Sequence, residues 1–398
     1  MRIFEADEKG KDFVMGKSGR RQETTGRPRS RKSSAKARAR KKRTRIILII
    51  AEVFILAILG VVLWGVTRVT DTEKVNIEVE IDPVIDQQIS QIPTREDGTT
   101  GKGYLNIALF GVDSREGNLS ANTRTDTIII ASINQDTGDV KLVSVYRDTY
   151  LNVGNDSYNK CNSAYMRGGP EQAIQMLNTN LDLNIENYVT VGFKGLINCI
   201  DALGGVEIDV QSNEIGYLND YQISMVGKSE DGIHFTANAG TDYTPVANSG
   251  VQVLNGLQAT AYCRIRYIGN DFGRTQRQRT VITQMLNRAQ NASPATLSSV
   301  AESTFANVST SFDLDTILTT VAGIGDYHIV GSEGFPFEEH RGGGIIGGKG
   351  SCVVPTTLTE NVSELYEFLF GVEDYVPSAT VQECSDKIYA DTAPYIGY

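Results

Sequence analysis

Hydrophobic residues gather in one long run near the N-terminus and in shorter, β-branched runs further along the chain. The long run spans residues 46–66 and contains a single charge, Glu52, in 21 positions. A helix rises about 1.5 Å per residue, so a helix of this length covers the roughly 30 Å hydrocarbon core of a bilayer. No small-residue cleavage site follows; Trp64, Thr67 and Arg68 stand there instead. We therefore expect a retained transmembrane helix rather than a cleaved signal peptide.

After residue 103, runs typical of strands alternate with patterns typical of helices. Residues 136–139 predict a hairpin turn between two strands, and Gly169-Pro170 is typical of a helix start. This alternation predicts an α/β protein, in which a three-layer α/β/α domain with a central mixed sheet is preceded by the transmembrane helix. Strands are expected at 104–113, 126–135, 140–148, 188–193 and 206–210, and helices at 171–183 and 193–205.

The rest of the chain is less regular. Beyond a polar, insertion-like stretch at 216–250, residues 252–267 are expected to form a turn and a strand, and residues 274–290 a helix. Further helices are expected at 315–324 and 360–371, with a glycine-rich loop at 342–351. We divide the chain into a basic tail (1–45), the transmembrane helix (46–66), an extracellular stalk or linker (67–103), the main α/β domain (104–292) and a C-terminal extension that packs on this domain or follows it (293–398).

Charge is distributed unevenly around the long apolar run. Residues 1–45 contain 17 lysines and arginines against five acids, a net of +12, so the remaining chain carries −22 to reach the overall −10. The positive-inside rule keeps such a basic flank in the cytoplasm, which predicts a single-pass protein of the cell membrane with residues 67–398 outside. The tail also attracts anionic lipid, whereas nucleic-acid binding is a weaker explanation of its charge.

Cysteine and histidine usage excludes several familiar classes of protein. Five cysteines are too few for a disulfide scaffold, although we expect a Cys352–Cys384 bridge from the C-terminal position of both. The three histidines stand singly, without a zinc-binding pattern. The glycine-rich loop is only a near match to a phosphate-binding P-loop, because Gly350 replaces the required serine or threonine.

Six arginines and no lysine fall between residues 264 and 288, in a part of the chain that is otherwise acidic. Guanidinium groups pair bidentately with phosphate oxygens and keep their proton. On the expected strand, Arg264 and Arg266 would share one face. On the following helix, Arg274 and Gln278 would also point the same way, with Arg277 beside them. Salt bridges to surrounding acids are the alternative explanation of the patch.

Acids and arginines also occur together at the ends of three expected strands, where ligands of open α/β sheets collect. The charges in each pair could neutralise one another. Alternatively, Asp113 and Asp126 could hold Mg²⁺, which takes one or two carboxylates plus substrate phosphates. Arginines and a divalent cation together suit a pyrophosphate. The three pairs are Asp113 with Arg115, Arg124 with Asp126, and Arg147 with Asp148.

Seven separated blocks give the chain a resemblance to a known family. Over roughly residues 104–289 it resembles the LytR-CpsA-Psr (LCP) family. This resemblance implies an α/β/α fold with a hydrophobic pocket for a polyprenyl chain. It also implies an activity that transfers anionic glycopolymers from a polyprenyl-pyrophosphate carrier to peptidoglycan, commonly with Mg²⁺. In chain order the blocks are GVDSRE, RTDTIIIASIN, SVYRDT, NKCNSAYMRGGP, FKGLINCIDALGGVEIDV, LNGLQATAYCRIRY and DFGRTQRQR.

The resemblance further implies roles for residues at matching positions. Asp113 and Asp126 match metal-binding aspartates, for Mg²⁺ or Mn²⁺. Leu151 stands where some relatives carry an arginine, so one phosphate contact is missing or is supplied by another residue such as Lys160. The pyrophosphate-contacting positions are Arg124, Arg147, Arg264, Arg266, Arg274 and Gln278, with Arg277 in the same block. Arg124, Arg147 and a candidate base, Asp148, are the expected catalytic residues, and Ile174, Leu177, Leu196, Ile197 and Ile200 are the expected lining of the lipid pocket.

Together these inferences predict a membrane-anchored extracellular phosphotransferase. A peptidoglycan hydroxyl would attack the sugar-proximal phosphorus, and polyprenyl phosphate would leave. The cargo would be a teichoic acid or a secondary-wall or capsular polysaccharide, and the partners its lipid carrier, peptidoglycan and the membrane. Three alternatives stay open: a non-catalytic wall protein that binds polyprenyl phosphate or polysaccharide, an envelope regulator acting through the basic tail, and a pyrophosphate hydrolase.

Overall fold

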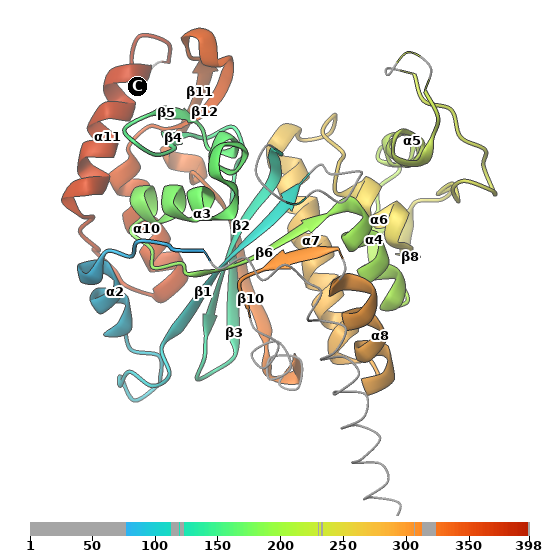
Figure 1. The fold of residues 1–398 in the computed structure, drawn as a ribbon, viewed down its shortest axis with the longest axis horizontal. Coiled ribbons are helices and arrows are strands. Elements are labelled where there is room, and N and C mark those ends of the chain that lie inside the picture. The colour runs from blue at the N-terminus through green and yellow to red at the C-terminus, as the bar shows by residue number, and fades with distance from the viewer. Residues whose placement is uncertain are drawn as a thin grey trace, which may run out of the picture. The chain divides into compact units, whose positions relative to one another are not determined.

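A computed structural model describes most of the chain beyond residue 76 (Figure 1). The expected transmembrane helix at 46–66, the basic tail and nearly all of the expected helix at 315–324 lie outside the described residues. Within the described part, no helix combines the length and apolar character needed to cross a bilayer. The described residues are 77–112, 119, 123–229, 231, 234–305, 307–312 and 324–396.

A six-stranded mixed sheet forms the centre of the domain, in the order β10-β3-β2-β1-β6-β9. Strand β2 is antiparallel to both of its neighbours, β1 and β3, whereas β6 pairs with β1 and β10 pairs with β3 in parallel. The four expected strands that begin at 104, 126, 140 and 188 are confirmed. The strands are β1 (Tyr104–Val112), β2 (Thr125–Asn134), β3 (Asp139–Val145), β6 (Asn187–Gly192), β9 (Val308–Thr310) and β10 (His328–Phe335).

Strand β1 shows how both faces of the sheet are covered. Successive side chains of a strand point to opposite faces. Phe110 and its alternate neighbours Ala108 and Val112 are buried on one face, and Leu109 is half-buried on the other. Phe110 packs edge-to-face against Tyr165, with the ring centroids 5.3 Å apart. The face that carries Leu109 is therefore the one that remains partly open.

Helices lie on both sides of the sheet (Figure 1). The first side carries the larger hydrophobic core, with helices α2, α3, α10 and α11. On the second side α7 contacts β3 and β10, and α4 packs against α6 and α8. The helices are α2 (Pro83–Ser90), α3 (Asn162–Leu181), α4 (Phe193–Ala202), α5 (Ile215–Val226), α6 (Gly256–Tyr262), α7 (Asn270–Gln290), α8 (Pro294–Phe305), α10 (Leu358–Phe370) and α11 (Ala379–Thr392), with short 3₁₀ turns at Ile324–Asp326, Glu338–His340 and Gly347–Lys349.

Three two-stranded sheets complete the fold. The expected strand at 206–210 is confirmed, but it pairs with β8 outside the central sheet. The expected glycine-rich loop at 342–351 is largely a hairpin instead, because Arg341–Ile345 pairs in antiparallel register with Ser351–Pro355. The pairs are β4 (Tyr150–Asn152) with β5 (Tyr158–Lys160), β7 (Val206–Val210) with β8 (Gly250–Leu254), and β11 (Arg341–Ile345) with β12 (Ser351–Pro355).

The strand expected within 252–267 is wrong over most of its length. Residues 250–254 form β8, but Gly256–Tyr262 is helical and Arg264 and Arg266 lie in the turn that follows. A capping box explains the helix, since the Asn255 side chain accepts from the Gln258 N–H and the Gln258 side chain accepts from the Asn255 N–H. The alternating pattern of the two arginines therefore does not describe a strand face.

The expected domain limits do not coincide with the limits of the sheet. Edge strands β9 and β10 come from the region assigned to a C-terminal extension, and they hydrogen-bond to β6 and β3. Part of the expected stalk also belongs to the domain, because Ile85 and Ile89 of α2 are buried in the larger core. β9 has only three residues, and two glycines interrupt β10, so neither has a strong strand signal in the sequence.

The expected Cys352–Cys384 bridge is wrong, since all five cysteines are free. Both side chains are buried in the larger core. Cys384 Sγ accepts from the Asn152 side chain at 3.9 Å, whereas Cys352 Sγ lies 3.5 Å from the Gly350 carbonyl. Each thiol therefore fills space as a small apolar group with a weak polar contact.

Gly256 fixes the distance between α4 and α6, and replacing it should loosen this side of the fold. A Cβ at Gly256 would lie 2.2 Å from the Ile197 carbonyl oxygen, a backbone atom that cannot turn away. We expect Gly256→Ala to destabilise the domain by about 3 kcal/mol, as overpacking does. Gly216, on α5, is the matched control because a Cβ there meets nothing within 4 Å. Urea unfolding of Gly256→Ala and Gly216→Ala measures the difference; equal stabilities would contradict the close approach.

Candidate functional site

A cavity of about 920 Å³ lies on the partly open side of the sheet. Strands β1, β2 and β6 contribute to its lining, together with α4 and α7. Most of its lining surface is apolar, so the interior suits an apolar ligand. Its apolar residues include Leu109, Val112, Ile129, Val189, Val191, Phe193, Leu196, Val281, Ile282, Met285 and Val308.

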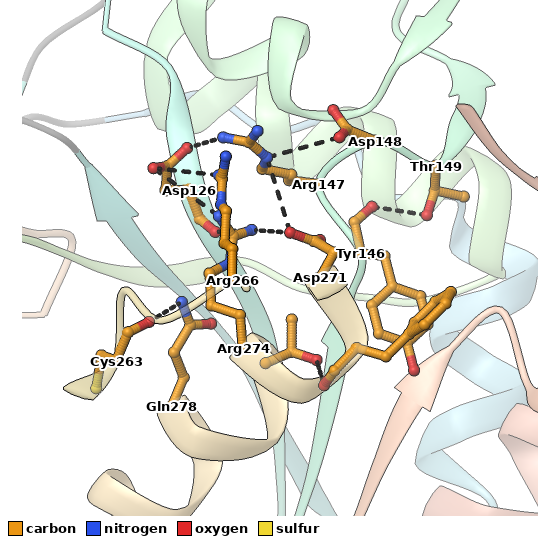
Figure 2. A network of polar contacts seen from close by, with 12 residues as sticks. Asp126, Tyr146, Arg147, Asp148, Thr149, Cys263, Arg266, Asp271, Arg274 and Gln278 are labelled. Atoms are coloured by element: carbon orange, nitrogen blue, oxygen red, sulfur yellow. Dashed lines mark hydrogen bonds and ion pairs between the residues drawn. The ribbon is translucent and has the colours of Figure 1, made fainter. Parts of the chain in front are cut away.

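Charged side chains of the same cavity gather around Asp126, near the start of β2 (Figure 2). Arg147, which follows β3, donates to Asp126 Oδ1. From the 264–268 turn and α7, Arg266 Nη2 and Arg274 Nη1 lie 3.7 and 4.0 Å from Asp126 Oδ2. Arg274 Nη2 also donates to the Asp126 carbonyl at 3.0 Å. Guanidinium groups from three separate segments thus converge on one carboxylate.

Two further acids, which do not line the cavity, contact these arginines. Asp271 Oδ1 lies 2.6 Å from Arg274 Nη2 and 4.0 Å from Arg147 Nε. Asp148 Oδ2 lies 3.7 Å from Arg147 Nε, and its other oxygen lies 3.4 Å from Lys160 Nζ. Figure 2 shows Asp148 and Asp271 on either side of the Arg147 guanidinium. Neither acid lines the cavity, so both fix the arginines without occupying the space they face.

Arg264 is held differently, by aromatic rings. Its guanidinium carbon lies 4.7 Å from the centre of the Phe193 ring and 5.2 Å from that of Tyr221. Its Nη1 also donates to the Ser224 hydroxyl at 3.4 Å. In a cation–π contact the face of the ring attracts the guanidinium electrostatically. Arg264 therefore adds a further cation to the cavity lining.

Burial has a strong effect on the charged cluster. Arg274 is 2% exposed, and desolvation lowers the pKa of its guanidinium to about 10, against the opposing pull of Asp271. Arg274 remains positive at neutral pH. Burial likewise raises the pKa of Asp271, while Arg274 and Arg147 act to lower it. For Arg147, burial acts to lower the pKa, but Asp126 and Asp148 outweigh it and the net change is upward.

Several buried polar atoms in the cavity wall lack a hydrogen-bond partner among the described residues. They include the donor Arg274 Nε and the acceptors Gln278 Oε1 and Thr260 Oγ1. An unsatisfied buried polar group costs about 1–3 kcal/mol. These atoms have almost no accessible surface of their own, so the cost falls on the stability of the wall rather than on the binding of a ligand.

The structure brings together most of the residues that the sequence assigned to pyrophosphate. Arg124, Arg147, Arg264, Arg266, Arg274 and Gln278 all line the cavity, and so does Asp126. Asp113 lies outside the described residues. Asp148, the candidate base, stands behind Arg147 rather than in the lining.

Arg277 does not join this group, which corrects the expectation that it stands beside Arg274. Its Nε donates to Glu214 Oε1 at 2.7 Å, and its other nitrogens donate to the carbonyls of Ile265 and Ile268 at 3.1 Å. Both members of this ion pair are buried. Arg277 lies three positions after Arg274 on α7, and the two side chains contact different groups. Arg277 therefore holds the 264–268 turn, on which Arg266 stands.

The expected lipid pocket is mostly wrong in its residues. Only Leu196 of the five lines the cavity. Ile174 and Leu177 are fully buried in the core on the other side of the sheet, and Ile200 is fully buried in a smaller core between α4, α6 and β7. Ile197 is not in the lining either. Periodicity in a helix identifies an apolar face but does not tell whether a core or a cavity covers it.

The residues that were missed are alternate positions of strands and one face of α7. Leu109 and Ile129 on the strands and Ile282 on the helix are examples. The sequence does contain a signal for such residues. When a strand is apolar on both faces, the face that does not pack on the main core must be covered by something else. The side that opens into a cavity is determined by tertiary packing.

A divalent cation is compatible with the oxygen donors of this site. The carboxylate of Asp126 lines the cavity, and among the described residues no hydrogen bond reaches its Oδ2. A carboxylate oxygen of this kind is a ligand that Mg²⁺ prefers, with the remaining positions filled by phosphate and water. No group of three or more acidic, histidine or cysteine side chains suited to a metal occurs within the described ranges. A metal here would therefore depend on the substrate for much of its coordination.

Comparison with known proteins agrees with this geometry. Residues 67–345 match the protein family described as "LytR_cpsA_psr family". The chain belongs to the LytR-CpsA-Psr family. It is 32% identical over 270 residues to a polyisoprenyl-teichoic acid–peptidoglycan teichoic acid transferase, TagU, from Oceanobacillus iheyensis, which covers 65% of this chain and 73% of that protein.

Solved structures confirm the LCP fold. A protein from Enterococcus faecalis described as a transcriptional regulator aligns with a TM-score of 0.54 and 24% identity, covering 74% of this chain and 97% of that one. TagV of Bacillus subtilis aligns with a TM-score of 0.51 and 23% identity, covering 69% and 98%. At these identities the likeness establishes the mixed α/β fold.

In this LCP domain the Arg277–Glu214 pair should act on stability. Arg277→Met leaves Glu214 charged, buried and unpaired, and such a change costs about 3–5 kcal/mol. The double variant Arg277→Met/Glu214→Leu removes both charges and should recover much of that loss. Urea unfolding of the two variants and the wild type measures the coupling. A double variant no more stable than Arg277→Met would contradict a buried pair that holds the turn.

Proposed function

We propose that this protein transfers an anionic glycopolymer from a polyprenyl-pyrophosphate carrier to peptidoglycan. The observation that carries the proposal is that five arginines line the same cavity as a large apolar surface. A polyprenyl chain fits the apolar interior, and a pyrophosphate fits the guanidiniums around Asp126. The name of the relative from Oceanobacillus iheyensis, a teichoic acid transferase that uses a polyisoprenyl carrier and peptidoglycan, points to the same reaction.

In the proposed reaction, an acceptor hydroxyl oxygen bonds to the sugar-proximal phosphorus and the bridging P–O bond breaks. Polyprenyl phosphate leaves with the electron pair of that bond, and its phosphate takes up the hydroxyl proton. Arg147, Arg266 and Arg274 stabilise the charge that develops on the phosphate oxygens. Reactions of this type rely on positioning and charge stabilisation, so no protein nucleophile is required.

Asp148 receives a different role from the one first expected. Its two oxygens lie against Arg147 and Lys160, and it is not among the residues that line the cavity. We therefore assign Asp148 to positioning Arg147 rather than to accepting the hydroxyl proton. Lys160 contacts Asp148, which in turn contacts Arg147. We propose that Lys160 acts on the site in this indirect way, since Leu151 stands where some relatives carry an arginine.

Asp126 is the described residue that would hold Mg²⁺ or Mn²⁺, with Asp113 proposed beside it. The cation would supply charge neutralisation at the pyrophosphate oxygens. The membrane topology expected from the sequence completes the proposal: residues 46–66 anchor the protein, and the LCP domain works outside the cell, where peptidoglycan lies. The identity of the glycopolymer is proposed at the level of an anionic wall polymer.

Removing one cavity arginine should abolish most of the transfer. The full chain is incubated with a synthetic polyprenyl-pyrophosphate glycan and peptidoglycan fragments, with and without Mg²⁺, and linked product is measured. We expect Arg274→Ala and Arg147→Ala to reduce kcat about 10²–10³-fold, as loss of a transition-state donor does. Arg167→Ala is the control, because that arginine is exposed on α3 and does not line the cavity.

The same assay separates the alternatives. A pyrophosphate hydrolase would release the glycan phosphate to water without any linked product. A binding protein or regulator would retain the lipid and show no turnover, with or without metal. Linked product formed equally well by Arg274→Ala and by the wild type would contradict the assignment of the site.

Occupation of the cavity by lipid should protect Cys199. This thiol lines the cavity and is partly exposed, whereas Cys161, Cys352 and Cys384 are buried elsewhere. Burial raises the pKa of Cys199 and slows its alkylation, yet access still determines the rate. We expect sugar-free polyprenyl pyrophosphate to slow modification by N-ethylmaleimide severalfold, as followed by mass spectrometry. Cys199→Ala identifies the signal of the other thiols; an unchanged rate for Cys199 would place the lipid elsewhere.

A further inference from the structure

Two tyrosines stack on each other at the protein surface. Tyr267 and Tyr217 have ring centroids 5.1 Å apart and an interplanar angle of 19°. Tyr267 is 76% exposed and Tyr217 is 37% exposed. Large aromatic rings gain stability from burial, so a stacked pair held in solvent is typical of a binding surface. We call this pair the tyrosine platform.

The tyrosine platform stands on two segments that also carry residues of the cavity lining. Tyr267 directly follows Arg266, which reaches Asp126. Tyr217 lies one turn before Tyr221 on α5, and residues four apart on a helix share a face. Tyr221 lines the cavity beside Arg264. The platform is therefore attached to the charged part of the cavity by both of the segments that form it.

The chemistry of the platform suits a sugar ring. The two rings offer a flat apolar face, and their hydroxyls offer polar tips, which together match a pyranose with its C–H face and its equatorial hydroxyls. A ring held there would contact the turn that also carries Arg264 and Arg266. A lipid tail would instead be expected inside the cavity, where water is excluded.

Of the two sugars in the proposed reaction, the acceptor is the one that needs such a surface. The donor sugar is already tethered to a pyrophosphate held by arginines. The acceptor brings a neutral hydroxyl to the reaction, so its binding has to come from contacts with its rings. A glycan strand also extends in both directions from the reacting residue, and a surface as exposed as Tyr267 leaves room for that.

We propose that the tyrosine platform binds the peptidoglycan glycan strand and presents its hydroxyl to the pyrophosphate. This inference rests on the proposed function for the reaction it serves, but binding of the strand can be measured without transfer. Tyr217 and Tyr267 are then positioning residues for the acceptor.

The test is titration calorimetry of the full chain with soluble, uncrosslinked glycan strands. Stacking on an aromatic ring contributes about 0.5–1.5 kcal/mol, so Tyr267→Ala should weaken strand binding about two- to tenfold. Tyr267→Phe keeps the ring and should bind nearly as the wild type does. Tyr389→Ala, an exposed tyrosine on α11, is the matched control and should have no effect. Sugar-free polyprenyl pyrophosphate should bind equally to all four proteins.

Two results would overturn the inference. The first is strand affinity that does not change in Tyr267→Ala. The second is weaker binding of a sugar-bearing polyprenyl pyrophosphate with unchanged strand binding, which would assign the platform to the donor sugar. A wild-type protein that binds strands through Tyr267 yet transfers nothing would refute the proposed function and leave the platform in place.

Discussion

The confinement of several guanidinium groups around one carboxylate is the constraint on which the site depends. Unit charges about 4 Å apart interact by roughly 4 kcal/mol at an effective dielectric constant of about 20. Arg147, Arg266 and Arg274 share one carboxylate, so Asp126 neutralises only one of three positive charges. Asp271 and Asp148 offset further charge from outside the cavity, whose own lining holds five arginines and one acid. The space that the arginines face therefore retains a positive potential, and an anion placed there completes the charge balance.

The fold satisfies this constraint because the charged residues stand on well-packed helices and strands. Arg274 stands on a 21-residue helix, and Asp126 lies on a ten-residue central strand. The least regular contributor is the 264–268 turn, and Arg277 holds it by donating to two of its carbonyls. On the other side of the cavity, α4 and α6 both contribute to the lining and approach each other closely at Gly256.

The sequence was informative where a local pattern determines the structure. Strands β1, β2, β3 and β6 followed from β-branched runs, and the cavity arginines followed from the motif blocks. The sequence was uninformative where tertiary packing determines the direction of a side chain or the side of the sheet on which it lies. Arg277 and Arg274 have the same chemistry and differ only in direction around α7, while Ile174 and Leu196 are both apolar but lie on opposite sides of the sheet. The helix at Gly256–Tyr262 had a readable signal in the Asn255–Gln258 capping box, which outweighs the apparent alternation of Arg264 and Arg266.

An apolar cavity and an arginine cluster in one site select for a ligand that neither would select alone. Inorganic phosphate would satisfy the arginines but leave the cavity wall in contact with water. A neutral lipid would cover the wall at about 25 cal/mol per Å² and leave the guanidiniums uncompensated. Only an anion with a long apolar tail both compensates the guanidinium charges and covers the apolar wall. Arg264, which lines the cavity and contacts the rings of Phe193 and Tyr221, combines both properties in one place, because its cation stands against apolar surface.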